Sequence, residues 1–280
     1  MNARVWHLRK RDVVVLTLCA AFLISTLGAV GEGGRRRAKE VVCQSSLRQW
    51  NAVFRDYLVH NNGKFLSGCN TNGYWWPLQL PLEQQDWKRN RTWFCPTATM
   101  PVADERGVSA TALTIFNSWG IFKPTPMTYQ GQTYVAHPNG LCGSYGLNGY
   151  VLNIPETSRY EGARPAAYGW RDLTNVLMGD SVPMFIDAIR FDLLPLYTDQ
   201  PSAFESATWS SNNQIGRCCI NRHNGGVSCL FVDGSVRKVG LKELWTLKWH
   251  KSFHTAGPWT KAGGVWPQDW PQWMREFRDY

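Results

Sequence analysis

The segment RHNGGVSCLFVDGSVRKV, residues 222–239, holds two turn signals on either side of an apolar run. Asn224-Gly225 and Asp233-Gly234 are dipeptides typical of tight hairpins, because the central positions of such turns need positive φ. The apolar run VSCLFV between them fits one strand, and VRKV fits the next. With RCCINR (217–222) as a first strand, the segment predicts a three-stranded antiparallel meander.

His223 and Asp233 are separated by nine residues, a spacing that raises the question of a catalytic or metal-binding pair. A six-residue strand spans roughly 20 Å, so the two side chains are expected at opposite ends of the strand. We therefore predict that both residues stabilise turns through backbone or neighbouring contacts, with Gly234 supplying positive φ. No catalytic residue is predicted.

The N-terminus divides into a basic leader (1–12), an uncharged apolar run (13–30) and a segment that begins GEGGRRRAKE. Eighteen apolar residues lie at the lower edge of what spans a bilayer as a helix. We expect a transmembrane helix at 13–30. The alternative is a cleaved secretory signal with small residues Ala29 and Gly31 near the cut, and either reading exports residues 31–280.

Residues 31–63 carry a helical apolar stripe that includes Leu47, Trp50 and Phe54, and HNNG at 60–63 ends it. The sequence thus predicts an α+β fold. A long N-terminal helix, one half in the membrane and one half amphipathic, would pack through this stripe on an antiparallel sheet. Residues 64–280 form the globular domain, with a C-terminal wrap rich in tryptophan.

Charge and cysteine spacing exclude some functions. Residues 1–42 carry a net charge of +5 out of +9, so the rest has only +4 and no basic stripe for nucleic acid. No CxxC pair supports a thiolate zinc site. An acid-rich run lacks the spacing of a calcium loop, so no metal or cofactor is predicted; its members are Asp180, Asp187, Asp192 and Asp199.

Several segments together resemble bacterial prepilin-type proteins, the type IV pilins and type II secretion pseudopilins, in particular the general secretion pathway G-like group. His223, nine residues and Asp233-Gly234 resemble the H-X9-DG motif of that group. Further similar segments, in the expected order, are AKEVVCQSSLRQW (38–50), WFCPTA (93–98), GSYGLNGY (143–150), VPMFID (182–187) and INRHNGG (220–226). The similarity spans almost the whole chain.

The resemblance implies a pilin-type α+β fold and a structural subunit of a type II secretion or pilus-like system, without catalysis. Its implied partners are the inner membrane and other pseudopilins or secretion-system components. The family's Gly at the cleavage point and Glu at the fifth position of the helix are absent. We therefore expect an uncleaved single-pass protein of the bacterial inner membrane, with a cytoplasmic N-terminus and a periplasmic domain.

Two other functions compete with this one. An anchored extracytoplasmic binding module would stack glycan rings on exposed tryptophans, for which the candidates are Trp75, Trp76, Trp266 and Trp270. Three or more coplanar exposed rings along a groove would favour that function. An exported hydrolase is disfavoured because the chain has no G-x-S-x-G elbow and no H-E-x-x-H element.

Overall fold

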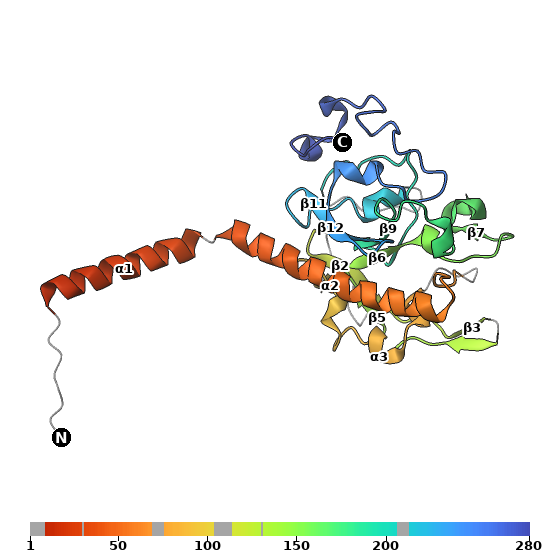
Figure 1. The fold of residues 1–280 in the computed structure, drawn as a ribbon, viewed down its shortest axis with the longest axis horizontal. Coiled ribbons are helices and arrows are strands. Elements are labelled where there is room, and N and C mark those ends of the chain that lie inside the picture. Colours follow the sequence, from red (N-terminus) through yellow and green to blue (C-terminus); the bar gives the residue numbers. More distant parts are fainter. Residues whose placement is uncertain (1–8, 30, 69–75, 104–113, 130, 206–212) are drawn as a thin grey trace, which may run out of the picture. The chain divides into compact units, whose positions relative to one another are not determined.

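The computed structural model describes residues 9–29, 31–68, 76–103, 114–129, 131–205 and 213–280. The chain separates into two units, Met1–Ala38 and Lys39–Tyr280. The first unit holds α1 (Lys10–Ala29) and the beginning of α2 (Glu32–His60), and the second holds the remainder of α2 and every strand (Figure 1).

The expected transmembrane helix at 13–30 is not supported. None of the helices in the described ranges has both the length and the apolar character that crossing a bilayer requires. The prediction of a single-pass inner-membrane protein with a periplasmic domain is therefore wrong.

The predicted pilin-type α+β fold is also wrong. No long apolar helix is found in the described part of the chain, because α1 ends at Ala29 and α2 begins at Glu32. The strands form several sheets, and two of these contain parallel pairs. The fold is mixed α and β. The helix boundary falls within a glycine-rich stretch where each glycine destabilises a helix by about 1 kcal/mol relative to alanine; its glycines are Gly28, Gly31, Gly33 and Gly34.

The largest sheet has five strands in the order β10-β6-β9-β11-β12 (Figure 1). Its members are β6 (Tyr145–Asn148), β9 (Pro183–Asp187), β10 (Asp192–Leu193), β11 (Gly226–Phe231) and β12 (Val236–Gly240). All neighbours are antiparallel except β10 and β6. Every residue of β6, β9 and β11 is buried, so these strands form the centre of the core.

The other strands form three small sheets. A three-stranded sheet has the order β1-β2-β5, from β1 (Met100–Pro101), β2 (Asn117–Phe122) and β5 (Leu141–Gly143). Two hairpins consist of β3 (Met127–Tyr129) with β4 (Gln132–Tyr134), and β7 (Arg159–Tyr160) with β8 (Arg164–Pro165). A third α-helix, α3 (Leu82–Gln85), is a single turn.

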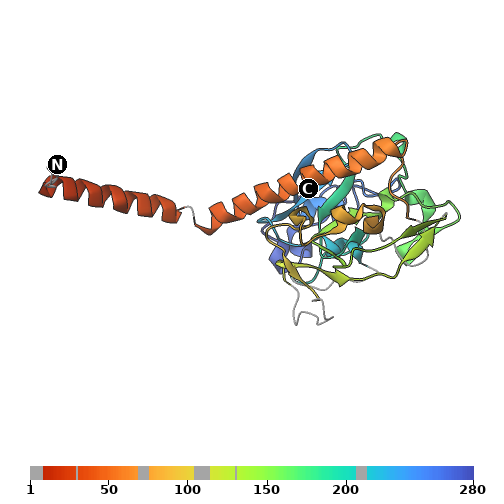
Figure 2. The same ribbon diagram turned by 90° about the horizontal axis from the view of Figure 1, so that it is seen from below.

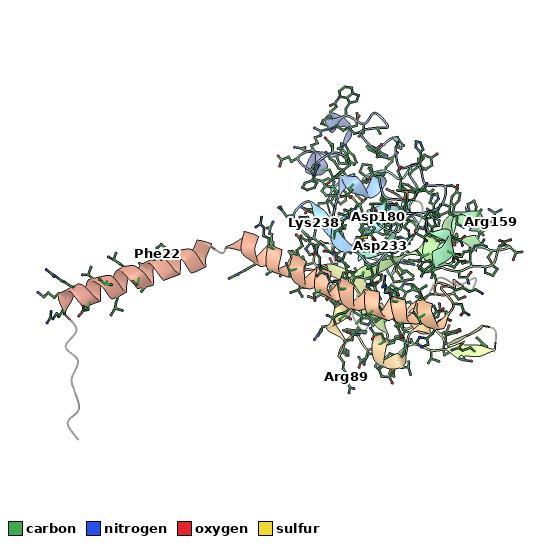
Figure 3. The ribbon with its side chains drawn as sticks, viewed as in Figure 1. Phe22, Arg89, Arg159, Asp180, Asp233 and Lys238 are labelled. Atoms are coloured by element: carbon green, nitrogen blue, oxygen red, sulfur yellow. The ribbon has the colours of Figure 1, made fainter. Side chains whose placement is uncertain are left out.

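The predicted meander is correct for two of its three strands. β11 and β12 pair antiparallel across the turn at Asp233, which is labelled in Figure 3 together with Lys238 on β12. The segment 217–222 is not a strand, because a 3-10 helix (Gln214–Arg217) runs into it. The second neighbour of β11 is instead β9, which is distant in sequence.

In the second unit, helix α2 runs alongside the strands (Figure 2). Its aromatic side chains are part of the hydrophobic core. Leu47, Trp50 and Phe54 are each no more than 1% exposed. The Trp50 ring lies 4.6 Å from that of Trp93 and 5.1 Å from that of Phe185 on β9. Its Nε1 donates to the carbonyl of Thr92 (2.8 Å), so the only polar atom of this buried ring has a hydrogen-bond partner.

Candidate functional site

Four side chains that are far apart in sequence meet in the interior. Cys43 lies on α2, Cys95 follows the 3-10 helix Arg91–Trp93, Asp187 ends β9, and His223 precedes β11. All four are no more than 1% exposed. Their sulfur, oxygen and nitrogen atoms all lie within 4.8 Å of one another. We refer to these residues as the buried cluster.

One ring nitrogen of His223 faces two members of the buried cluster. Nε2 lies 3.1 Å from Oδ2 of Asp187 and 3.3 Å from Sγ of Cys95. A Cys-His-Asp catalytic triad needs both ring nitrogens, one toward the nucleophile and one toward the acid. Here Nδ1 has no hydrogen-bond partner among the described atoms. The cluster is therefore not arranged as a proton relay.

The remaining contacts converge on the Asp187 carboxylate. Sγ of Cys43 lies 3.5 Å from Oδ2, and the Ser228 backbone N–H donates to the same oxygen (2.8 Å). Arg222, whose side chain is fully buried, contacts Oδ1 at 3.2 Å. Its guanidinium also donates to the carbonyl of Ser144. Asp187 is thus fixed by several elements at once.

Tyr145 and Ser144 support the two cysteines. The Tyr145 hydroxyl lies 3.1 Å from Sγ of Cys43, and Ser144 Oγ accepts a hydrogen bond from the Cys95 backbone N–H (2.6 Å). Ser144 directly precedes β6, and Tyr145 is the first residue of that strand. The Tyr145 hydroxyl therefore contacts the Cys43 sulfur, whereas the Ser144 hydroxyl holds the Cys95 backbone.

The pKa values of the cluster follow from burial and from charge. Burial would raise the pKa of Asp187, but the charge and hydrogen bond of His223 lower it to about 2. Burial would lower the pKa of His223, but the Asp187 charge raises it to about 10. Burial raises the pKa of Cys43 well above its usual value. For Cys95, burial is outweighed by the hydrogen bond to Cys43, and the pKa falls to about 6.

The first turn of the motif directs His223 inward. Asn224 and Gly225 have φ of 50° and 83°, which reverses the chain directly after the histidine. The His223 backbone N–H donates to the carbonyl of Gly226 (3.0 Å). His223 was expected at the corner of a hairpin; its backbone does lie beside the turn, but its side chain enters the core.

The second turn lies at the other end of β11. Oδ1 of Asp233 accepts hydrogen bonds from the N–H and hydroxyl of Ser235 (2.8 and 2.7 Å). Gly234 has φ of 91°. Arg55 on α2 donates to the Asp233 carbonyl (3.3 Å), and a Cβ on Gly234 would lie 3.0 Å from Nδ2 of Asn51. His223 and Asp233 therefore do not meet, and each faces α2.

Sequence reasoning missed the buried cluster because its four members are separated by 52, 92 and 36 positions, far from any metal-ligand spacing. Of the acid-rich run, only Asp187 enters the cluster. Asp192 contacts Arg217 (3.2 Å), and Asp199 accepts from the Ile215 backbone N–H (3.0 Å). A signal was present, however, because each cluster residue lies in one of the segments 38–50, 93–98, 182–187 and 220–226, which the sequence motifs single out.

The tryptophans proposed for glycan binding do not form a platform. Trp76 and Trp270 are buried, at 0% and 1% exposed, whereas Trp266 is 65% exposed. Trp75 lies outside the described residues. The Trp270 ring packs 5.3 Å from that of Trp245, within the C-terminal wrap. Among the described candidates, one exposed ring is too few for a stacking groove.

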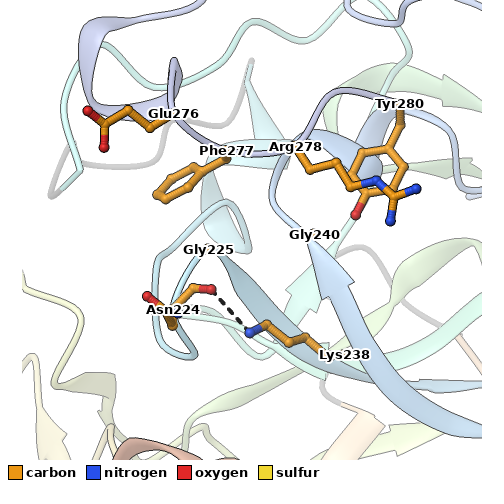
Figure 4. Close-up of a pocket in the computed structure, with 8 residues that line it drawn as sticks. All are labelled: Asn224, Gly225, Lys238, Gly240, Glu276, Phe277, Arg278 and Tyr280. Carbon is orange, nitrogen blue, oxygen red and sulfur yellow. Dashed lines mark hydrogen bonds between the residues drawn. The ribbon is translucent and has the colours of Figure 1, made fainter. Parts of the chain in front are cut away.

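An open hollow of about 510 Å³ lies between the first turn and the C-terminus (Figure 4). Lys238 enters it from β12, and Phe277, Arg278 and Tyr280 enter it from the end of the chain. The Lys238 ammonium already contacts the Asn224 carbonyl (3.1 Å) and Glu40 (3.4 Å). The positive charge of Lys238 is therefore already paired and does not mark this hollow as a ligand site.

Comparison of the chain with family models, with curated proteins and with solved structures gives no match.

Proposed function

We propose that the protein is a non-catalytic structural subunit of a pseudopilin-like assembly, with other pseudopilins or secretion-system components as partners. One observation carries the proposal. The segments that resemble pseudopilins supply the buried cluster and its immediate supports, through Cys43, Cys95, Tyr145, Asp187 and His223. Segments separated along the chain thus contribute to one buried site.

The geometry of the H-X9-DG motif supports a structural role. His223 at one end is in the cluster with Cys43 of α2, and the carbonyl of Asp233 at the other end is held by Arg55 of α2. Cys43 and Arg55 are twelve residues apart, about 18 Å along a helix. The six residues of β11 span roughly 20 Å. The nine-residue spacing therefore matches two attachment points on one helix.

The burial of the cluster argues against catalysis. A nucleophile or general base must come within hydrogen-bond reach of its substrate. Cys95, Asp187 and His223 are at most 1% exposed and are in contact with one another. Their reactive atoms contact one another in the interior and are not accessible to a substrate, as is typical of a structural site.

The outer side of α2 offers a surface for a partner subunit. Val41, Val42 and Val59 are 63%, 52% and 77% exposed. Val59 also borders a hollow of about 530 Å³ between α2 and the Asp233 turn. We place the partner subunit on these exposed apolar side chains of α2.

Photo-crosslinking tests the proposal. A photoreactive amino acid would replace Val42 or Val59 in the full chain, expressed in its native cells, with the exposed Arg159 position as a control. We expect adducts with a pilin-like or secretion-system protein from positions 42 and 59, and not from 159. Absence of such adducts at both α2 positions, with the variants folded and abundant, would contradict the proposal.

A further inference from the structure

We infer that Cys43, Cys95, Asp187 and His223 bind one zinc ion, at a structural site that joins α2 to β9 and to the β11–β12 hairpin. The inference rests on the buried cluster alone and does not depend on the proposed function. The ligands come from four segments, so an ion at their centre would connect the helix to the Cys95 loop and to the two neighbouring strands β9 and β11.

The spacing of the donor atoms fits a tetrahedral zinc ion. Zinc–ligand bonds of about 2.0–2.3 Å place neighbouring ligands about 3.3–3.8 Å apart. His223 Nε2 lies 3.3 Å from Cys95 Sγ and 3.1 Å from Asp187 Oδ2, and Cys43 Sγ lies 3.5 Å from the same oxygen. No pair of donor atoms exceeds 4.8 Å. Shifts of a few tenths of an ångström in these three pairs, and of at most about 1 Å in the other three, would complete the tetrahedron.

The convergence of acceptors favours a shared cation over hydrogen bonds alone. Nε2 of His223 carries at most one proton and cannot donate it fully to both Cys95 and Asp187. A metal ion accepts lone pairs from all of these atoms at once. The ring already presents Nε2 to the centre of the cluster, which is the orientation that metal binding requires.

Charge balance supports a divalent ion. With both thiols ionised, Cys43, Cys95 and Asp187 carry three negative charges. Zinc and the fully buried Arg222, which contacts Asp187 at 3.2 Å, carry three positive charges. The site would be neutral as a whole, which matters because uncompensated charge is costly to bury. Binding needs both sulfurs ionised and Nε2 of His223 unprotonated, so any protons on these three atoms are released to solvent.

The ligand types select zinc among common ions. Two thiolates, an imidazole and one carboxylate suit zinc, whereas calcium needs six to eight oxygens and magnesium an octahedron of oxygens. Four protein ligands close the coordination sphere, which is typical of structural and not catalytic zinc. Arg222, the Ser228 N–H and the Ser144 hydroxyl hold Asp187 and Cys95 in place, as supports of metal ligands commonly do.

Metal analysis of the full chain, purified without chelator, tests the inference. We expect about one zinc per chain, and after exchange with Co²⁺ a thiolate-to-cobalt charge-transfer absorption in the near ultraviolet with the visible bands of tetrahedral cobalt. Cys95→Ser should lower the zinc content and weaken the sulfur absorption. Cys142→Ser is the matched control, because Cys142 is equally buried but lies outside the cluster.

The zinc content and the cobalt spectrum of the wild-type protein test the inference even if a ligand variant does not fold. Wild-type protein that binds neither zinc nor cobalt when supplied with either would overturn the inference. So would a cobalt spectrum without thiolate absorption, equal zinc in Cys95→Ser and wild type, or a Cys43–Cys95 disulfide in the native protein.

Discussion

Nε2 of His223 lies 3.1 Å from Oδ2 of Asp187, and both side chains are fully buried. Asp187 is also in contact with Arg222 and Cys43. The histidine of the H-X9-DG motif is thus part of the interior, and the aspartate to which it is bound lies on β9 and not in the motif. This relationship makes His223 a structural anchor.

Replacing Asp187 by Asn should destabilise the protein by about 3–5 kcal/mol, because it leaves the buried Arg222 and His223 without their negative partner. Asp180→Asn is the control, since Asp180 is exposed (Figure 3), and its effect should stay within about 0.5 kcal/mol. Urea unfolding of both variants measures the difference. Equal midpoints for the two would mean that the Asp187 charge has no structural role.

Trp50→Ala should lower the free energy of unfolding by about 3–5 kcal/mol, because its fully buried ring packs against Trp93 and Phe185 and would leave a large cavity. Trp266→Ala removes the same side chain from a position that is 65% exposed, and should change stability little. Thermal or denaturant melts compare the two. A melt of Trp50→Ala that matches wild type would show that α2 is not held by this ring.

Gly234→Ala should destabilise by about 1–3 kcal/mol, through strain at positive φ and through the contact of the new Cβ with Asn51. Gly264 offers a matched control, since its φ is 90° against 91° for Gly234, and a Cβ there meets nothing within 4 Å. Gly264→Ala should therefore cost less in a denaturant titration. If the two variants are equally stable, the second turn makes no specific contact with α2.

Stability should fall as the pH is lowered from about 6.5 toward about 3, partly through His250. Burial, with the charges of Lys248 and Arg164, lowers the pKa of this histidine from 6.5 to about 3. In that window the unfolded chain binds a proton that the folded chain does not, so His250 contributes a loss of about 1.4 kcal/mol per pH unit.

In the wild type, the Ser252 backbone N–H donates a hydrogen bond to Nδ1 of His250 (3.2 Å). His250→Asn removes the titrating group and keeps an acceptor for this N–H. The stability gap between wild type and variant should shift in favour of the variant as the pH falls. Denaturant titrations at several pH values measure that gap. A constant gap would mean that His250 titrates alike in both states.

Local signals in the sequence were sufficient for local structure. The turn dipeptides mark both ends of β11, and VPMFID contains β9 (Pro183–Asp187). Turn geometry is fixed by glycine and asparagine within a few residues, which is why it can be predicted from short segments. The second turn differs in detail, because Gly234 has positive φ and Asp233 does not.

Long-range pairing could not be predicted in the same way. β11 pairs with β9, and β10 pairs in parallel with β6. The residue pattern of a strand predicts that it is a strand, but it does not identify the strand with which it pairs. RCCINR was expected to be a strand, but Cys218 and Cys219 are both buried beside a 3-10 helix. The buried cluster depends on all of these pairings, so spacing alone did not reveal it.

Hydrogen exchange of α2 in wild type and in His223→Gln tests the central claim, that the histidine of the motif is a structural anchor of this helix. The account predicts faster amide exchange at residues 43–58 in the variant, because the link between His223, Asp187 and Cys43 is weakened while the aromatic contacts of α2 remain. Trp266→Ala should leave exchange at 43–58 unchanged. Wild-type exchange rates across 43–58 in His223→Gln would contradict the account.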